Sequence, residues 1–152
     1  MGAVVPTPSP DERGTITLTI GSRLEFLSMV HALIEGIARQ FELDDDTSSA
    51  LMIAVIEAGT NAIQHGNAFA DDKTVTFIFR VSTGDVTVQV DDHGKGFDPG
   101  KVEDPTDPSN LLDPNGRGLY LMRTLMDEVH FKTRIDHGTT VRLRKSRPVA
   151  AR

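Results

Sequence analysis

The fold is indicated most clearly by the run Glu57-Ala58-Gly59-Thr60-Asn61-Ala62-Ile63-Gln64-His65. Its polar side chains Glu57, Asn61 and His65 recur every four residues, a spacing that stacks them on one face of an α-helix. The residues around them are mostly small or apolar, so the helix is expected to be largely buried. Because an unpaired carboxylate or amide in a protein interior is costly, this polar stripe needs partners.

The chemistry of the stripe allows two interpretations. A bound cation would satisfy it, since the Asn61 side-chain oxygen is a hard ligand suited to Mg²⁺ and Glu57 beside it could act as a general base. Alternatively, the three side chains hydrogen-bond to neighbouring backbone groups and have only a structural role.

Upstream of this helix, the sequence predicts one strand and one further helix. Thr15–Ile20 alternates threonines with apolar residues, as in a strand with one solvated face. Ser22 can cap the helix that follows. The apolar residues of that helix recur at spacings of three and four: Leu27, Val30, Ile34, Ile37 and Phe41. The central helix is expected over Thr47–Gly66, since Asp44–Asp46 precede it and suit its positive N-terminal end.

Downstream, the sequence predicts four strands and a third helix around a long loop. Strands Thr74–Ser82 and Asp85–Asp91 are joined tightly at Thr83-Gly84. The loop from Asp92 to Gly116 is rich in Gly, Pro and Asp, and loops of this length usually act as lids or binding loops. The remaining elements are a helix marked by Leu119, Met122, Leu125 and Met126, then strands Val129–Ile135 and Thr139–Leu143. This order predicts an α+β two-layer sandwich, in which helices cover one face of a mixed, mostly antiparallel sheet.

Two glycine-bearing motifs flank the long loop. In Asp91-Asp92-His93-Gly94-Lys95-Gly96-Phe97 the glycines allow the backbone to turn sharply and approach a flat ligand. A carboxylate here can accept a hydrogen bond from an adenine amino group, although the motif also fits a simple Asp-Gly turn. Asn115-Gly116-Arg117-Gly118-Leu119 opens the third helix, where free N–H groups and the helix dipole favour an anion such as a triphosphate. Arg117 can reach phosphate oxygens in a forked geometry; otherwise it is solvated and the glycines are hinges.

Together the three motifs supply the parts that a nucleotide site needs: base recognition, a metal ligand, a phosphate-binding helix start and a movable cover. Gly138-Thr139-Thr140 begins the final strand and completes the set. The sequence contains neither a P-loop nor a dinucleotide-binding fingerprint.

Length and composition narrow the class of protein. The 152 residues suit one domain, expected over residues 14–145, with a mobile N-terminal tail at 1–13 and a C-terminal tail at 146–152. A net charge of −6 without a basic stripe argues against direct nucleic-acid binding. No apolar stretch approaches the ~20 residues that cross a bilayer, and no export signal begins the chain, so we expect a soluble, cytoplasmic protein. The absence of cysteine excludes disulfides and thiolate metal sites.

The three motifs make the sequence resemble the GHKL ATPase superfamily, and within it the anti-sigma-factor serine kinases of bacterial partner-switching systems. Residues 57–65 resemble the N box of that family, and residues 116–129 resemble its lid exit and third helix. The similarity extends from about Thr15 to Leu143. Two features depart from the family pattern: Gly59 lies inside the N-box helix, and the Asp- and Pro-rich segment from Gly100 to Pro114 lacks a clear lid pattern.

The resemblance implies a role for each matching residue. Glu57 would be the general base and Asn61 the Mg²⁺ ligand, and His65 matches the N box without an assigned role. Asp92 would recognise adenine and Thr139 would support the adenine edge. The remaining ATP-contacting residues would be Gly94 and Gly96 around the base, and Gly116, Arg117, Gly118 and Leu119 at the phosphates.

The implied function is that of an ATP- and Mg²⁺-dependent serine/threonine protein kinase and anti-sigma factor, which phosphorylates an anti-sigma-factor antagonist. Its partners would be that antagonist, a sigma factor and a second copy of the chain in a homodimer, in transcription regulation under stress. A nucleotide-dependent sigma-factor-binding module without significant turnover is the alternative, because it needs the same pocket. The ATP-binding half of a two-component histidine kinase fits less well, since no dimerising hairpin with a phospho-accepting histidine precedes residue 15.

Overall fold

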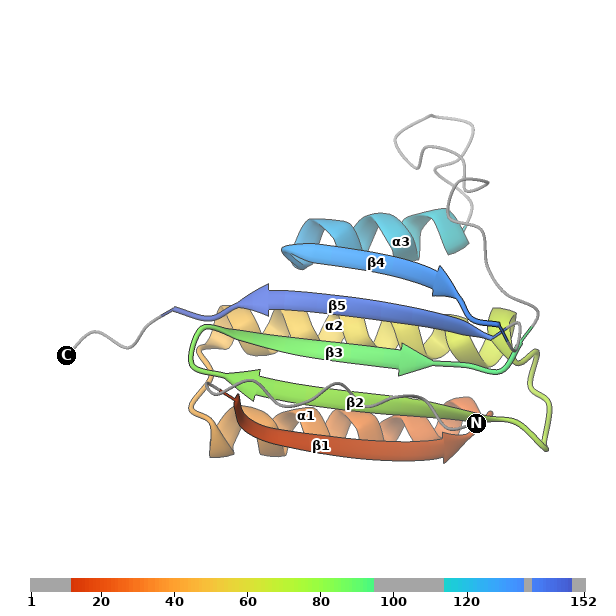
Figure 1. The fold of residues 1–152 in the computed structure, drawn as a ribbon, viewed down its shortest axis with the longest axis horizontal. Helices are drawn as coiled ribbons and strands as arrows, with labels where there is room; N and C mark the ends of the chain where they lie inside the picture. The colour runs from red at the N-terminus through yellow and green to blue at the C-terminus, as the bar shows by residue number, and fades with distance from the viewer. Residues whose placement is uncertain (1–11, 95–113, 136–137, 149–152) are drawn as a thin grey trace.

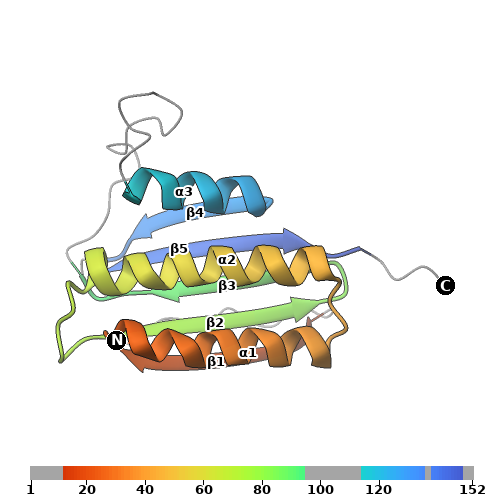
Figure 2. The same ribbon diagram turned by 180° about the vertical axis from the view of Figure 1, so that it is seen from behind.

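The computed structural model describes residues 12–94, 114–135 and 138–148. The strands within these ranges are β1 (Glu12–Gly21), β2 (Thr74–Ser82), β3 (Asp85–Asp91), β4 (Glu128–Thr133) and β5 (Thr139–Ser146). They form one sheet in the order β1-β2-β3-β5-β4, with every pairing antiparallel. Figures 1 and 2, which show opposite sides, place the helices together on one face of this sheet. The predicted α+β two-layer sandwich is therefore confirmed, with an antiparallel rather than a mixed sheet.

The helices are α1 (Leu27–Gln40), preceded by a 3-10 turn at Leu24–Phe26, then α2 (Asp45–Asn61) and α3 (Pro114–Leu125). A π-helical turn, η2 (Ala62–Gly66), extends α2. The element order predicted from the sequence is confirmed. None of the helices in the described ranges is long and apolar enough to cross a membrane.

Several boundaries differ from those predicted. The first strand begins at Glu12 rather than Thr15, so it takes in the last two residues of the predicted tail: Glu12 pairs with Ser82 of β2, and Arg13 lies at a shift in the register. The last strand continues to Ser146, three residues beyond Leu143. Helix α3 begins at Pro114, so its first turn takes in residues predicted to end the loop; proline suits that position because the first helical N–H has no intrahelical acceptor. Residues 1–11, 95–113, 136–137 and 149–152 lie outside the described residues.

The start of α2 follows the predicted electrostatics. Asp44 has extended backbone angles and its side chain accepts a hydrogen bond from the Thr47 N–H, as an N-cap residue does. This hydrogen bond lowers the pKa of Asp44. Asp45 and Asp46 occupy the first turn, where the helix dipole favours negative charge.

The core lies between the helices and one sheet face. It takes Val30, Ile34 and Ile37 from α1, together with apolar residues from every second position of β2 and β3. Gly59 of α2 permits close packing here, since a Cβ would lie 2.9 Å from Leu27 and 3.0 Å from Phe77, both buried. This departure from the family pattern therefore has a packing reason.

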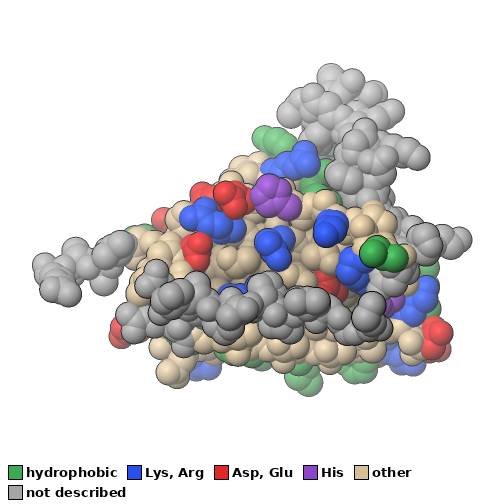
Figure 3. All heavy atoms as spheres, in the orientation of Figure 1, with side chains coloured by type: hydrophobic (Ala, Val, Ile, Leu, Met, Phe, Trp, Pro, Cys, Tyr) green, Lys and Arg blue, Asp and Glu red, His purple; other side chains and the backbone are tan. Residues whose placement is uncertain are grey.

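The other sheet face carries mostly polar residues, because successive strand residues point to opposite sides. Figure 3 shows lysine and arginine side chains spread over this face. The strand alternation assigns Arg80, Lys132, Arg142 and Arg144 to it.

Candidate functional site

The polar stripe of α2 faces the beginning of α3. A Cβ at Gly118 would lie 2.8 Å from Glu57 Oε2 and 3.6 Å from Asn61 Nδ2. The fold therefore brings together the helix stripe and the glycine-bearing helix start, which are about sixty residues apart in the sequence. Gly116 and Arg117 belong to the same first turns of α3, and the Arg117 side chain lies outside what the structure describes.

A cavity of about 150 Å³ lies beside this contact, between α2, α3 and the sheet. Its lining includes five predicted site residues: Asn61, His65, Asp92, Leu119 and Thr139. The other lining residues are Ala58, Ala62, Gly66, Met122, Phe131 and Val141. Apolar walls with a few converging polar groups are typical of small-molecule sites. Glu57 is not among the lining residues and lies at the contact with Gly118.

Asp92 is the most constrained polar group of this cavity. The residue is 5% exposed, and Oδ1 accepts hydrogen bonds from the Gly94 N–H at 2.9 Å and the Thr139 N–H at 3.1 Å. Oδ2 has no hydrogen-bond partner among the described residues. It lies against Gly66, where a Cβ would collide with it. One carboxylate oxygen is thus fixed by the backbone, and the other keeps its hydrogen-bonding capacity among the described residues.

Gly94, like Asp92, lies against Gly66 at the end of η2. A Cβ at Gly94 would collide with the Gly66 carbonyl group, so this position requires glycine for close backbone approach. Gly96, which was predicted to share this role, lies outside the described residues.

The π-helical turn brings His65 to the cavity. The Asn67 N–H donates to the Ala62 carbonyl at 2.8 Å, an i to i+5 hydrogen bond that widens the helix. His65 lines the cavity with its side chain largely exposed. Four-residue spacing predicted the right side of the helix for His65, but the π-helical turn was not predicted.

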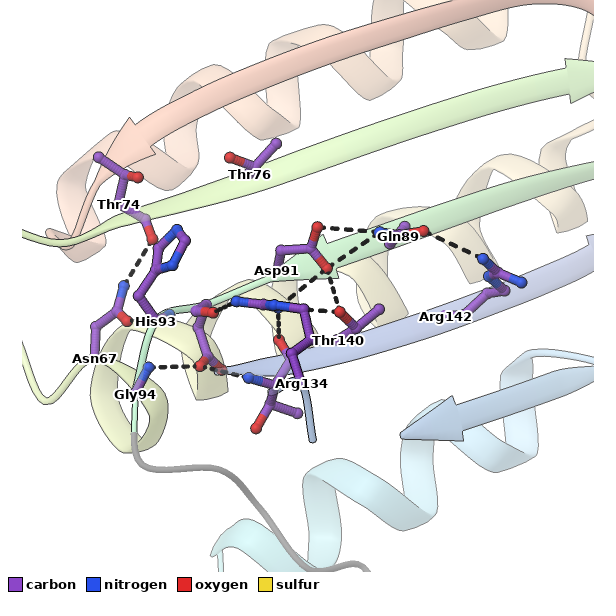
Figure 4. Close-up of polar contacts among 12 residues, drawn as sticks. Asn67, Thr74, Thr76, Gln89, Asp91, His93, Gly94, Arg134, Thr140 and Arg142 are labelled. Atoms are coloured by element: carbon purple, nitrogen blue, oxygen red, sulfur yellow. Dashed lines mark hydrogen bonds and ion pairs between the residues drawn. The ribbon is translucent and has the colours of Figure 1, made fainter. Parts of the chain in front are cut away.

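Asn67 and Arg134 are site-building residues that the sequence did not indicate. Asn67 is 1% exposed; its Nδ2 donates to Ser22 Oγ and the Thr74 carbonyl, both at 2.9 Å, and its Oδ1 accepts from the His93 N–H at 2.7 Å. Figure 4 shows Asn67 and Arg134 on either side of the segment that ends β3. A single asparagine after a helix gives no indication of these contacts, because Ser22 and His93 are 45 and 26 residues away in the sequence.

The side chains around the cavity suit Mg²⁺ better than a metal that needs several protein ligands. Within the described ranges no group of three or more His, Cys, Asp or Glu could hold an ion. Mg²⁺ commonly takes only one or two protein ligands and completes its shell with water and substrate phosphates. The Asn61 amide beside the α3 start fits that mode.

The two-layer fold and the cavity between α2 and α3 are features of a nucleotide-binding domain, and comparisons with known proteins identify the family. A family model described as "Histidine kinase-like ATPase domain" matches residues 20–145. The serine-protein kinase RsbW of Bacillus velezensis is 34% identical over 148 residues, covering 84% of this chain and 92% of that protein. The serine-protein kinase RsbW of Bacillus licheniformis is 39% identical over 132 residues, covering 80% and 78%. The chain belongs to the histidine kinase-like ATPase family and, within it, to the serine-protein kinase RsbW family.

Solved structures show the same fold. A crystal structure of RsbU and RsbW domains from Mycobacterium tuberculosis matches 95% of this chain with a TM-score of 0.64 at 20% identity. This chain spans 34% of that longer chain. The mycobacterial sensor histidine kinase MprB matches 89% of this chain and 100% of its own, with a TM-score of 0.54 at 14% identity.

Proposed function

We propose that this protein is an ATP-dependent serine/threonine protein kinase and anti-sigma factor that phosphorylates an anti-sigma-factor antagonist. The observation that carries the proposal is the convergence of Glu57, Asn61 and the start of α3 beside a cavity with Asp92 in its wall. Membership of the RsbW family supports the protein-kinase assignment over other ATPase activities.

Asp92 is proposed to select the base. Its Oδ2 is an acceptor without a partner in the described part of the chain, and the exocyclic amino group of adenine is a donor of the right kind. Met122, Phe131 and Val141 provide apolar surface for the flat ring. The Thr139 N–H fixes the carboxylate, so Thr139 supports the base through Asp92.

The start of α3 is proposed to receive the triphosphate, because the first N–H groups of a helix have no intrahelical acceptor and attract anions. Gly116 in the first turn supplies a backbone N–H group there, and Arg117 adds a positive charge. Gly118 and Leu119, one turn further along, would lie beside the nucleotide, next to Glu57 and at the cavity wall. Asn61 would hold Mg²⁺, which offsets the charge that develops on the transferred phosphoryl group.

Glu57 is proposed as the general base. The γ-phosphoryl group passes from ATP to the hydroxyl oxygen of a serine or threonine on the antagonist, while Glu57 accepts the hydroxyl proton and ADP leaves. Gly118 has no side chain, so the space in front of the Glu57 carboxylate stays open to the acceptor hydroxyl. Such transfer depends mainly on positioning and electrostatics.

The test is phosphate transfer from γ-labelled ATP to a candidate antagonist. We expect label on a serine or threonine of the antagonist, with Glu57→Ala retaining ATP affinity and losing transfer. Nucleotide-dependent capture of a sigma factor without any transfer would instead indicate the binding module. Full transfer activity in Glu57→Ala would remove the base assignment. Sedimentation of the purified protein tests the proposed homodimer.

A further inference from the structure

Arg134 connects three acceptors at the end of the sheet. It directly follows β4, and its Nη1 donates to the Thr139 carbonyl at 2.9 Å and to Thr140 Oγ1 at 3.0 Å. Its Nη2 donates to the backbone carbonyl of Asp92. Figure 4 shows the guanidinium lying across the ends of β3 and β5. One rigid fork therefore joins the two strand ends that carry Asp92 and Thr139.

A buried carboxylate holds this fork in place. Asp91, 5% exposed, lies 3.5 Å from Arg134 Nη1 and accepts hydrogen bonds from Thr140 Oγ1 at 2.7 Å and from Gln89 Nε2. Because successive strand residues point to opposite faces, Asp91 lies on the helix-free face while Asp92 faces the cavity. Arg134 therefore contacts the Asp92 main chain from the opposite side of the sheet and is not among the residues that line the cavity.

The β4–β5 turn leaves room for this contact. A Cβ at Gly138 would collide with both the Arg134 guanidinium and the Asp92 carbonyl oxygen. The Gly138 carbonyl also accepts the Arg134 N–H at 2.7 Å. Any side chain at this position would separate Arg134 from Asp92.

We propose that Arg134 is a positioning residue that sets the orientation of the Asp92 carboxylate and hence the preference for a 6-amino purine. The inference rests on the proposed function, since it acts through the base contact assigned to Asp92. The guanidinium fixes the Asp92 carbonyl and the Thr139 carbonyl, so the Thr139 N–H that binds Asp92 Oδ1 is held in register. The free Oδ2 then points consistently into the cavity.

The test compares the affinity for ATP with the affinity for inosine triphosphate, which carries an oxo group where adenine has its amino group. A shift in the carboxylate weakens only the contact to the amino group. For Arg134→Ala we expect ATP affinity to fall about tenfold, as for the loss of one well-oriented hydrogen bond to a charged group. Affinity for inosine triphosphate and the transfer rate at saturating ATP should each change by less than about twofold, which is clearly smaller than the tenfold loss of ATP affinity.

Arg142→Ala is the matched control. Arg142 lies on the same sheet face and donates to Gln89 Oε1 at 3.3 Å, whereas the hydrogen bonds of Asp92 within the described residues come from Gly94, Thr139 and Arg134. It should keep the wild-type preference for ATP. Arg134→Lys provides a second variant that keeps the charge beside Asp91. A single ammonium cannot span both carbonyls, so the preference should again fall, though less.

Asp92→Asn distinguishes the positioning role of Arg134 from the base contact of Asp92. If Asp92→Asn lowers the preference for ATP while both Arg134 variants keep it, the positioning role is wrong and the base contact stands. Equal loss of affinity for both nucleotides in folded Arg134 variants would also overturn the positioning role, because it would indicate general damage. If Asp92→Asn leaves the preference unchanged, the base contact and the role of Arg134 fall together.

Discussion

Gly118→Ala is the sharpest perturbation of the contact between α2 and α3. The added Cβ would lie 2.8 Å from Glu57 Oε2, about 0.6 Å inside the 3.4 Å at which ordinary van der Waals contact begins. The clash is with the end of a flexible side chain, so the carboxylate can move away without disturbing the backbone. Alanine is also the better helix former, by about 0.5–1 kcal/mol. The free energy of unfolding should therefore stay constant or rise slightly.

Catalysis should respond differently from stability. The Glu57 carboxylate must move by about 0.6 Å or more, and misplacement of a reacting group by about 1 Å can lower a rate about 100-fold. We expect the rate of phosphate transfer to fall by about tenfold or more, while the melting temperature is unchanged or higher. Thermal denaturation and single-turnover transfer from labelled ATP measure the two quantities on the same preparation.

Gly36→Ala is the control, because a Cβ at this position of α1 meets nothing within 4 Å. It carries the same gain in helix propensity and should leave the transfer rate unchanged. Wild-type transfer in a folded Gly118→Ala variant would refute the argument that this glycine keeps the space in front of Glu57 open.

Three further predictions concern the scaffold. Gly59→Ala should lower the free energy of unfolding by about 1–2 kcal/mol in urea titrations, since overpacking against buried Phe77 outweighs the gain in helix propensity. Asn67→Ala removes three hydrogen bonds, among them the one from the His93 N–H, so it should cost about 1–3 kcal/mol in the same assay and also weaken ATP binding by calorimetry. The Ser146 N–H lowers the pKa of Asp127 below 3.8 in the folded state, so the resulting stabilisation is present above that value and lost as the pH falls through the lowered pKa. Asp127→Asn should therefore flatten this part of the acid-unfolding curve, and an unaltered curve would argue against the Ser146 contact.

Much of the fold could be predicted because its signals are local. The three- and four-residue spacing of Leu27, Val30, Ile34 and Ile37 describes the buried face of α1 directly. The Thr83-Gly84 turn fixes the β2–β3 hairpin and hence its register. The stripe of Glu57 and Asn61 identified the helix face that meets α3, because polar residues on a buried helix require a partner.

The rest depends on contacts between residues far apart in the sequence. The π-helical turn at Ala62–Gly66 arises where α2 meets the end of β3, and no local pattern indicates it. From the sequence alone, Arg134 would be taken for a solvated residue in a turn. Its contact with Asp92 depends on the pairing of β3 with β5, which the local sequence does not indicate. Asn67 likewise joins partners 45 and 26 residues away.

The most direct test of the central claim is a crystal structure with Mn²⁺ and a non-hydrolysable ATP analogue, in which anomalous scattering locates the metal. We predict a manganese peak in direct contact with the Asn61 amide oxygen, phosphates at the start of α3 and the adenine amino group at Asp92 Oδ2. A nucleotide bound elsewhere, or a metal without contact to α2, would contradict it.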